Sequence, residues 1–154
     1  MTEPISIDGN GNYPQGTPLH TLNEFYAAFN SRNLTRMSQV WLQTAEASMD
    51  NPLGGISRGW EAISAVYSKL FKSAARIRVE FHDYTLHAGN DFFLAVGRER
   101  GEFSKGGIAL PLAIRTSRLF LRIDGVWRQL HHHGSFDDPR ILADYQAAVA
   151  GKAA

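Results

Sequence analysis

Three consecutive histidines, His131, His132 and His133, are the residues of this chain with the clearest capacity for chemistry. An imidazole titrates near neutral pH, so it can exchange a proton, contact an anion or ligate a metal. Side chains alternate along a strand, which places His131 and His133 on one face and His132 on the other. For His131 and His133, a structural hydrogen bond and a role in a pocket are both open. We expect no metal site, because no third ligand accompanies the pair.

An Asp124-Gly125 pair precedes the histidines and predicts a two-residue hairpin turn. Such a turn sets the register of its strands, here with Ile123 opposite Val126. The sequence does not say which face of the resulting sheet is concave. The register predicts a polar cluster on one face, in which Arg118 faces His131, Thr116 faces His133, and Ser135 lies just beyond.

Arg118 needs a partner of opposite charge, and its own strand, from Ile108 to Ile123, contains no Asp or Glu. A guanidinium held in a half-dry cavity binds a carboxylate through paired, charge-assisted hydrogen bonds. That carboxylate could belong to a side chain such as Glu24, in a structural ion pair, or to a ligand. Arg98 on the preceding strand could join Arg118, although the loop between the two strands does not determine their register.

Several aromatic residues and one loop complete the candidate site. Tyr26, Trp60 and Tyr67 lie on apolar helical stripes, a position typical of a core or of a pocket wall. We therefore expect no cofactor there. Asn51 opens a turn-rich loop, and the preceding Asp50 is typical of a turn cap, although a catalytic carboxylate is the alternative.

The spacing of apolar residues changes along the chain, and this change predicts the helices and strands that position these residues. Helical spacing of apolar residues predicts three helices, which begin after Thr17, Asn33 and Gly59. A short strand is expected at 46–49. Alternating apolar and polar residues predict four long strands, at about 76–88, 92–103, 108–123 and 126–136. A last helix follows Asp138, and the whole order predicts an α+β fold in which a bent antiparallel sheet is covered by the three early helices.

The length and the composition exclude several classes of protein. The 154 residues correspond to one domain, which we divide into an arm at 1–16, the main domain at 17–136, and a C-terminal helix and tail at 137–154. Lys and Arg total 16 against 15 Asp and Glu, a balance that argues against nucleic-acid binding. The absence of cysteine excludes disulfides and thiolate chemistry. No signal peptide or membrane span is evident, so we expect a soluble, cytoplasmic protein without membrane partners.

Over residues 17–136 this order of elements resembles the nuclear transport factor 2-like superfamily, which includes SnoaL-like and ketosteroid-isomerase-like proteins. Two motifs are similar to the association domain of calcium/calmodulin-dependent protein kinases and its stand-alone bacterial relatives. They are Asn51-Pro-Leu-Gly-Gly-Ile-Ser-Arg-Gly59, and Arg118-Leu-Phe-Leu-Arg-Ile-Asp-Gly-Val-Trp127 continuing to His131-His-His-Gly-Ser135. The resemblance implies a cystatin-like cone with a strongly bent sheet. The C-terminal helix lies outside the core pattern, and kinase activity is not implied.

The resemblance also implies an incomplete set of known catalytic groups. Ketosteroid isomerases place their proton-shuttling Asp directly before the proline of the loop, where this chain has Asn51. SnoaL-type cyclases use an acid on the last strand, where this chain has Gln129, His131 and His133. Scytalone-dehydratase-like members use His and Tyr around the pocket, and both residue types are present here.

The kinase association domains carry pocket arginines at positions that match Arg98 and Arg118, whereas a third such position is Gly134 here. The resemblance thus implies a site for a small carboxylate. Further residues expected around that ligand are Thr116, Trp60, Tyr67 and Asn51.

Three hypotheses for function remain. The first is a binding domain for a small polar or carboxylate-bearing organic molecule. The second is a lyase or isomerase with His131 or His133 as general base and Tyr26 or Tyr67 as acid. The third is an assembly module. We also expect a homodimer, because the outer face of the sheet would carry the apolar residues Leu119, Leu121 and Leu130.

Overall fold

Each helix begins at a residue whose chemistry explains the boundary. The computed structural model describes residues 6–151. Thr17 caps the first helix by accepting a hydrogen bond from the His20 N–H at 3.3 Å, and Gly59 precedes the third helix at φ +84°, a conformation that favours glycine. The four helices are α1 (Pro18–Asn30), α2 (Leu34–Val40), α3 (Trp60–Lys72) and α4 (Pro139–Val149).

The strands form one six-stranded sheet with the order β2-β1-β6-β5-β4-β3. Strands β3 to β6 follow one another as an antiparallel meander, as the alternating pattern predicts. The short β1 pairs in parallel with β6 and in antiparallel with β2. The strand bounds are β1 (Ser48–Asp50), β2 (Ser57–Arg58), β3 (Arg76–Ala88), β4 (Phe92–Lys105), β5 (Ile108–Ile123) and β6 (Val126–Phe136).

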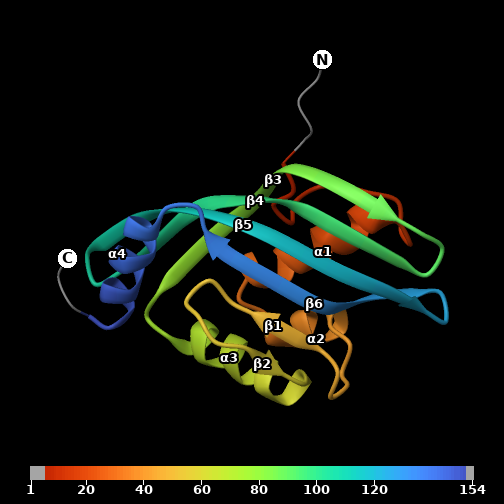
Figure 1. Cartoon of the computed structure of the whole chain (residues 1–154), viewed down its shortest axis with the longest axis horizontal. Helices are drawn as coiled ribbons and strands as arrows, with labels where there is room; N and C mark the ends of the chain where they lie inside the picture. The colour runs from red at the N-terminus through yellow and green to blue at the C-terminus, as the bar shows by residue number, and fades with distance from the viewer. Residues whose placement is uncertain (1–5, 152–154) are drawn as a thin grey trace.

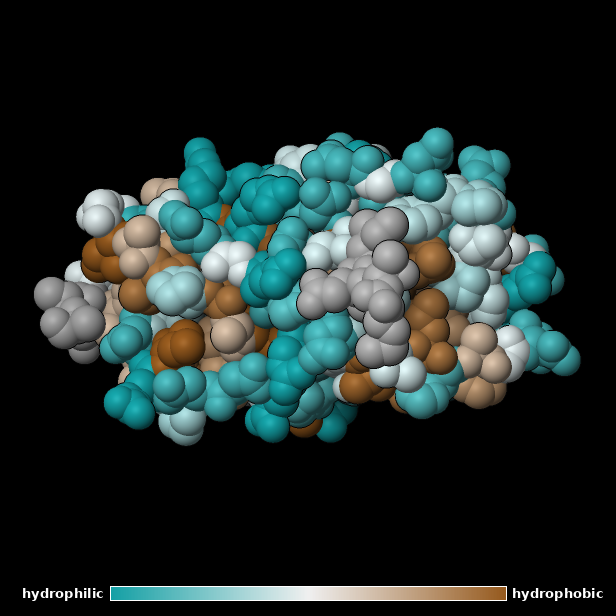
Figure 2. Space-filling model, turned by 90° about the horizontal axis from the view of Figure 1, so that it is seen from above, coloured by the Kyte–Doolittle hydropathy of each residue, from teal (hydrophilic) through white to brown (hydrophobic). Residues whose placement is uncertain are grey.

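The long strands curl over the early helices, and α4 lies at one end of the sheet (Figure 1). This arrangement confirms the predicted α+β class, including the additional C-terminal helix. Core side chains such as Phe25, Trp41 and Phe81 fill the space between the layers. Seen from above, hydrophobic side chains lie toward both ends of the surface, and hydrophilic ones lie between them (Figure 2).

The register between β5 and β6 differs from the predicted one beyond the first pairs. Ile123 faces Val126 as expected, but the register shifts after the pair formed by Phe120 and Gln129. Leu130 is the extra residue in β6, so the strand contains a bulge. A shift of one residue exchanges the two faces of a strand. The predicted pairs are therefore wrong: Arg118 faces His132, and Thr116 faces Gly134.

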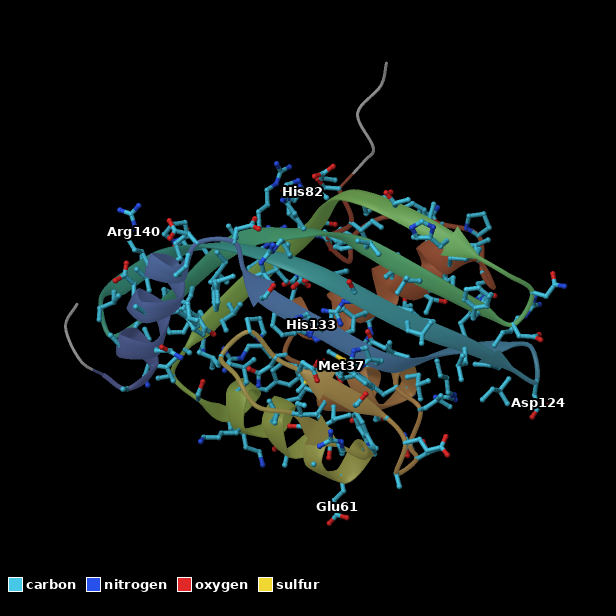
Figure 3. The ribbon with its side chains drawn as sticks, in the orientation of Figure 1. Met37, Glu61, His82, Asp124, His133 and Arg140 are labelled. Carbon is cyan, nitrogen blue, oxygen red and sulfur yellow. The ribbon has the colours of Figure 1, made fainter. Side chains whose placement is uncertain are left out.

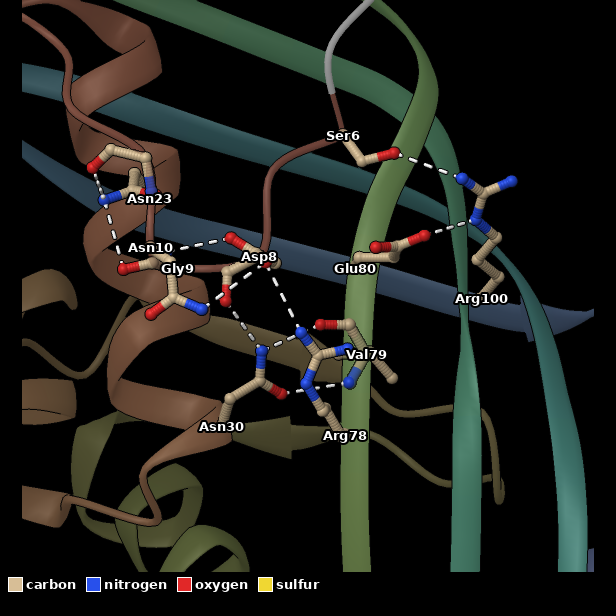
Figure 4. Close-up of polar contacts among 11 residues, drawn as sticks. Ser6, Asp8, Gly9, Asn10, Asn23, Asn30, Arg78, Val79, Glu80 and Arg100 are labelled. Carbon is tan, nitrogen blue, oxygen red and sulfur yellow. Dashed lines mark hydrogen bonds and ion pairs between the residues drawn. The ribbon is translucent and has the colours of Figure 1, made fainter.

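The described part of the N-terminal arm is held against the sheet and α1 by backbone and side-chain hydrogen bonds (Figure 4). Ile7 forms an antiparallel bridge with Phe81, with hydrogen bonds of 2.9 and 2.8 Å. The Asn30 side chain donates to the carbonyl oxygens of Asp8 and Val79 at 2.9 and 2.8 Å. Ile7 and Asp8 are thus tied to the folded domain. Within 6–151, no helix is long and apolar enough to cross a membrane.

Candidate functional site

A cavity of about 500 Å³ lies between the inner face of the sheet and helices α1, α3 and α4. Its walls are mainly apolar, and its charged groups are few. The wall residues that enclose it from the different elements include Phe25, Val66, Val79, Leu112, Phe136 and Tyr145. Such a cavity suits a small organic molecule, because a ligand pocket is typically concave and apolar with a few polar groups that orient the ligand.

Arg118 and Glu99 form a buried ion pair in the wall of this cavity. The side chains are 2% and 6% exposed, and Arg118 Nη2 lies 3.0 Å from Glu99 Oε2. Arg118 also donates to Gln129 Oε1 at 2.9 Å and to the Tyr26 hydroxyl at 3.3 Å. Glu99 accepts hydrogen bonds from Tyr26 at 2.7 Å and Thr116 at 2.9 Å. The two opposite charges are therefore matched within the protein itself.

The electrostatics of this network keep Arg118 charged and Tyr26 neutral. Burial alone would lower the pKa of Arg118, but its interactions with Tyr26, Glu99 and Tyr67 outweigh burial and raise that pKa. Burial, with the nearby charge of Glu99, raises the pKa of Tyr26 well above its usual value. The guanidinium also lies over the ring of Phe25, with Cζ 3.7 Å from the ring centroid.

His132 lies in the cavity wall without a hydrogen-bond partner among the described residues. It is 5% exposed, and within the described chain neither Nδ1 nor Nε2 has a hydrogen-bond partner. Burial, followed by the positive charge of Arg118, lowers the pKa of His132 well below its usual value. The imidazole is therefore neutral at pH 7 and offers one donor and one acceptor. A buried polar group without a partner costs about 1–3 kcal/mol, so it is normally satisfied.

The sequence contains a signal for the inward orientation of His132 that the turn alone does not reveal. Trp127 and Phe136 both lie on the inner face, yet they are separated by an odd number of positions. Strict alternation cannot bury both residues on one side. A shift of one residue between them was therefore readable from the two aromatic positions.

The outer face of β6 holds the two histidines that we proposed as pocket residues. His131 Nδ1 lies 2.7 Å from the Ser48 hydroxyl oxygen, and His133 Nδ1 lies 2.9 Å from Asp50 Oδ2. Both contacts arise from the parallel pairing of β1 with β6, and the position of His133 on β6 is labelled in Figure 3. In the part of the chain that the structure describes, no three His, Cys, Asp or Glu side chains are grouped to hold a metal.

Arg98 also lies away from Arg118. It is opposite Arg115 on the outer face of the sheet, where it forms ion pairs with Asp83 and Asp137. The neighbouring Glu99 points inward instead and pairs with Arg118. The alternation along β4 distinguishes the two residues, but Glu99 is not among the site residues that we expected from the sequence. The pair that we considered, Arg118 with Glu24, does not form, because Glu24 pairs with Arg36.

The remaining expected residues differ in their relation to the cavity. Tyr67 lines it and is buried, and burial raises its pKa to about 12. Asn51 also lines it, while its side-chain oxygen accepts a hydrogen bond from the Leu53 N–H at 2.8 Å and so stabilises the loop. Trp60 packs against Trp41, with ring centroids 6.5 Å apart. Thr116 acts on the cavity indirectly, through its hydrogen bond to Glu99.

Gly134 explains why a third arginine would not fit at its position. A Cβ atom there would lie 3.0 Å from Pro52 Cγ and 3.2 Å from His132 Nε2. Both distances are tighter than ordinary contacts, so a side chain would displace the loop or the imidazole. Because glycine has no side chain, position 134 leaves room for the neighbouring imidazole of His132.

Comparison with known proteins places this geometry in a family. The family model of the SnoaL-like domain matches residues 19–139. No curated protein matches the chain. Among solved structures, a protein from Thiobacillus denitrificans, assigned as a calcium/calmodulin-dependent protein kinase type II association domain, is 27% identical. It has a TM-score of 0.69 and coverage of 79% of this chain and 96% of its own.

Two further structures share the fold at lower identity. A protein from Streptomyces avermitilis, assigned as a dehydratase of the nuclear transport factor 2-like family, is 17% identical, with a TM-score of 0.69 and coverage of 76% and 91% of the two chains. An uncharacterised protein with a cystatin-like fold from Caulobacter vibrioides is 17% identical, with a TM-score of 0.65 and coverage of 85% and 94%. At these identities the likeness concerns the fold alone.

Proposed function

This chain belongs to the SnoaL-like domain family, and we propose that it binds a small, mainly apolar organic molecule in the cavity beneath its sheet. One observation carries the proposal. His132, buried and without a hydrogen-bond partner in the part of the chain that the structure describes, lines a cavity of about 500 Å³ whose walls are mainly apolar. A ligand would bury apolar surface against those walls, at about 25 cal/mol per Å². Its polar group would supply the hydrogen bond that the imidazole lacks.

The polar group of the ligand would lie near Arg118 and His132. A carboxylate is one possibility, because Arg118 is a cation in the cavity wall and the sequence resemblance implies such a ligand. A neutral hydrogen-bonding group is the other. Arg98, His131 and His133 lie on the outer face, so none of them supports the proposed ligand site.

A second candidate function is proton transfer to a bound substrate, as in a lyase or isomerase. The observation that favours it is again His132, because a neutral imidazole in a cavity can accept a proton. In this mechanism His132 is the general base, a role that we first assigned to His131 or His133. Tyr67 would be the acid, since Tyr26 already donates its hydroxyl proton to Glu99.

A thermal-shift experiment tests the binding proposal. The purified protein is heated with apolar probes such as ethylnaphthalene and naphthyl ethanol. A ligand at 100 times its Kd adds about 2.7 kcal/mol to the free energy of unfolding, and each kcal/mol raises Tm by roughly 2–4 °C for a chain of this size.

The matched variants are Leu112→Trp, which fills the cavity, and Val96→Trp, which adds the same ring to a half-exposed position on the outer face. We expect Leu112→Trp to abolish the ligand-induced shift and Val96→Trp to keep it. If no probe stabilises the wild type, or if both variants keep the shift, the cavity is not a binding site.

A further inference from the structure

The wall of the cavity is electrically balanced before any ligand binds, and from this balance we infer that the ligand is a neutral alcohol or phenol whose hydroxyl group bonds to His132. This inference rests on the proposed function and narrows its class of ligand. It assigns recognition to His132 rather than to Arg118.

The charges already present in the cavity wall disfavour an acidic ligand. Glu99 already pairs with Arg118 at 3.0 Å, and both side chains are buried. A carboxylate placed beside them would share one guanidinium with Glu99, so one negative charge would stay uncompensated among apolar walls. Burial of an unpaired charge is strongly unfavourable.

The lysines of the cavity wall are not available to a carboxylate at this depth. Among the described residues that line the cavity, the only other side chains with a full positive charge are Lys69 and Lys105. Lys69 is exposed, and Lys105 donates to the carbonyl oxygen of Val149 at 3.1 Å on α4. Neither replaces Arg118 as the counter-ion of a carboxylate that lies beside His132.

The chemistry of His132 itself favours a hydroxyl group. Burial opposes a positive charge on His132, and Arg118, its partner across the β5–β6 pair, acts in the same direction. A neutral imidazole has one N–H donor and one bare nitrogen, and here both are buried without a hydrogen-bond partner among the described residues. A hydroxyl group can donate to the bare nitrogen or accept from the N–H, so it suits either tautomer. A carboxylate can only accept.

The experiment compares three probes that share a naphthalene body: ethylnaphthalene, naphthyl ethanol and the carboxylate of naphthylacetic acid. Their Kd values are measured at neutral pH by fluorescence titration. We expect naphthyl ethanol to bind about tenfold more tightly than the naphthylacetic acid anion, and several-fold more tightly than ethylnaphthalene. His132→Phe should remove the preference for the alcohol over the hydrocarbon and leave the affinity for the hydrocarbon within about twofold.

Two controls keep the result interpretable. Tyr145→Phe removes a hydroxyl group from a ring in the same cavity wall, and it should keep the preference for the alcohol. His132→Gln keeps a donor and an acceptor and should retain part of it. If His132→Phe does not fold, the imidazole nitrogen resonances of isotope-labelled wild type give the readout, since naphthyl ethanol should shift those of His132.

The outcomes separate the inference from the proposed function. Tighter binding of the naphthylacetic acid anion would overturn the inference and leave the binding function intact. A preference for the alcohol that survives in His132→Phe would also overturn it. If none of the three probes binds, the proposed function itself fails.

Discussion

The side chains of Glu99 and Arg118 form an ion pair beneath the sheet of this protein, with Oε2 and Nη2 3.0 Å apart and both side chains buried. Each also has neutral partners, so the pair is a closed network of hydrogen bonds. A buried ion pair of this kind contributes little net stability relative to a well-packed apolar pair, but the loss of one member is costly. The network thus determines what the cavity wall can offer to a ligand.

Glu99→Gln should lower the free energy of unfolding by about 3–5 kcal/mol, because it leaves the Arg118 guanidinium buried without a counter-charge. Urea denaturation of the wild type and the variant measures the change. Glu24→Gln is the matched control, since Glu24 and Arg36 form an exposed pair that is worth about 0–1 kcal/mol. Equal losses in the two variants would show that the buried pair has no special role.

The same Glu99→Gln variant should change the preference for ligands. Arg118 would then lack a carboxylate partner, and a bound carboxylate could take the place of the lost charge. We expect the Kd of the naphthylacetic acid anion to fall about tenfold or more, while that of naphthyl ethanol changes by less than about threefold. An unchanged Kd for the naphthylacetic acid anion would mean that the charge of Glu99 does not exclude acids.

His132 should make the protein less stable at mildly acidic pH. Its pKa is lowered in the folded state, first by burial and then by Arg118, whereas the unfolded value is about 6.5. Above that value both states are neutral and His132 contributes no pH dependence. As the pH falls below about 6.5, the unfolded chain takes up a proton that the folded chain does not, so stability decreases by up to about 1.4 kcal/mol per pH unit.

Denaturation curves between about pH 7 and pH 5 test this linkage. His132→Gln should reduce the slope of stability against pH by about one proton, and His87→Gln, which changes an exposed histidine, should keep the wild-type slope. A slope that is the same in His132→Gln and the wild type would contradict a depressed pKa.

We propose that two copies of the chain associate through the outer face of the sheet. The pairs formed by Phe92 with Leu121 and Leu94 with Leu119 create an apolar row there, and Phe92 is 44% exposed. We expect light scattering to give the mass of a dimer, and Leu119→Arg to give that of a monomer with an unchanged circular dichroism spectrum. A monomeric wild type at every concentration would refute the proposal.

The fold was predictable from the sequence because its signals are local. Periodicity and caps such as Thr17 indicate each helix, and the alternating strands indicate the meander. The site was less predictable, because it depends on register over long strands. The two-residue turn at Asp124-Gly125 predicts the register as far as the pair of Phe120 with Gln129, but it does not predict the bulge at Leu130. The inward position of Glu99 depends on the same kind of long-range register.

The bulge at Leu130 also affects how the lining of such a pocket can change during evolution. Loss or gain of a single codon at this position would exchange the side chains beyond it between the interior and the exterior in one genetic step. His131 and His133 would then turn inward, and His132 would turn outward, with no residue substituted. Two relatives could therefore carry the same three histidines and still present different chemistry to the molecules they meet.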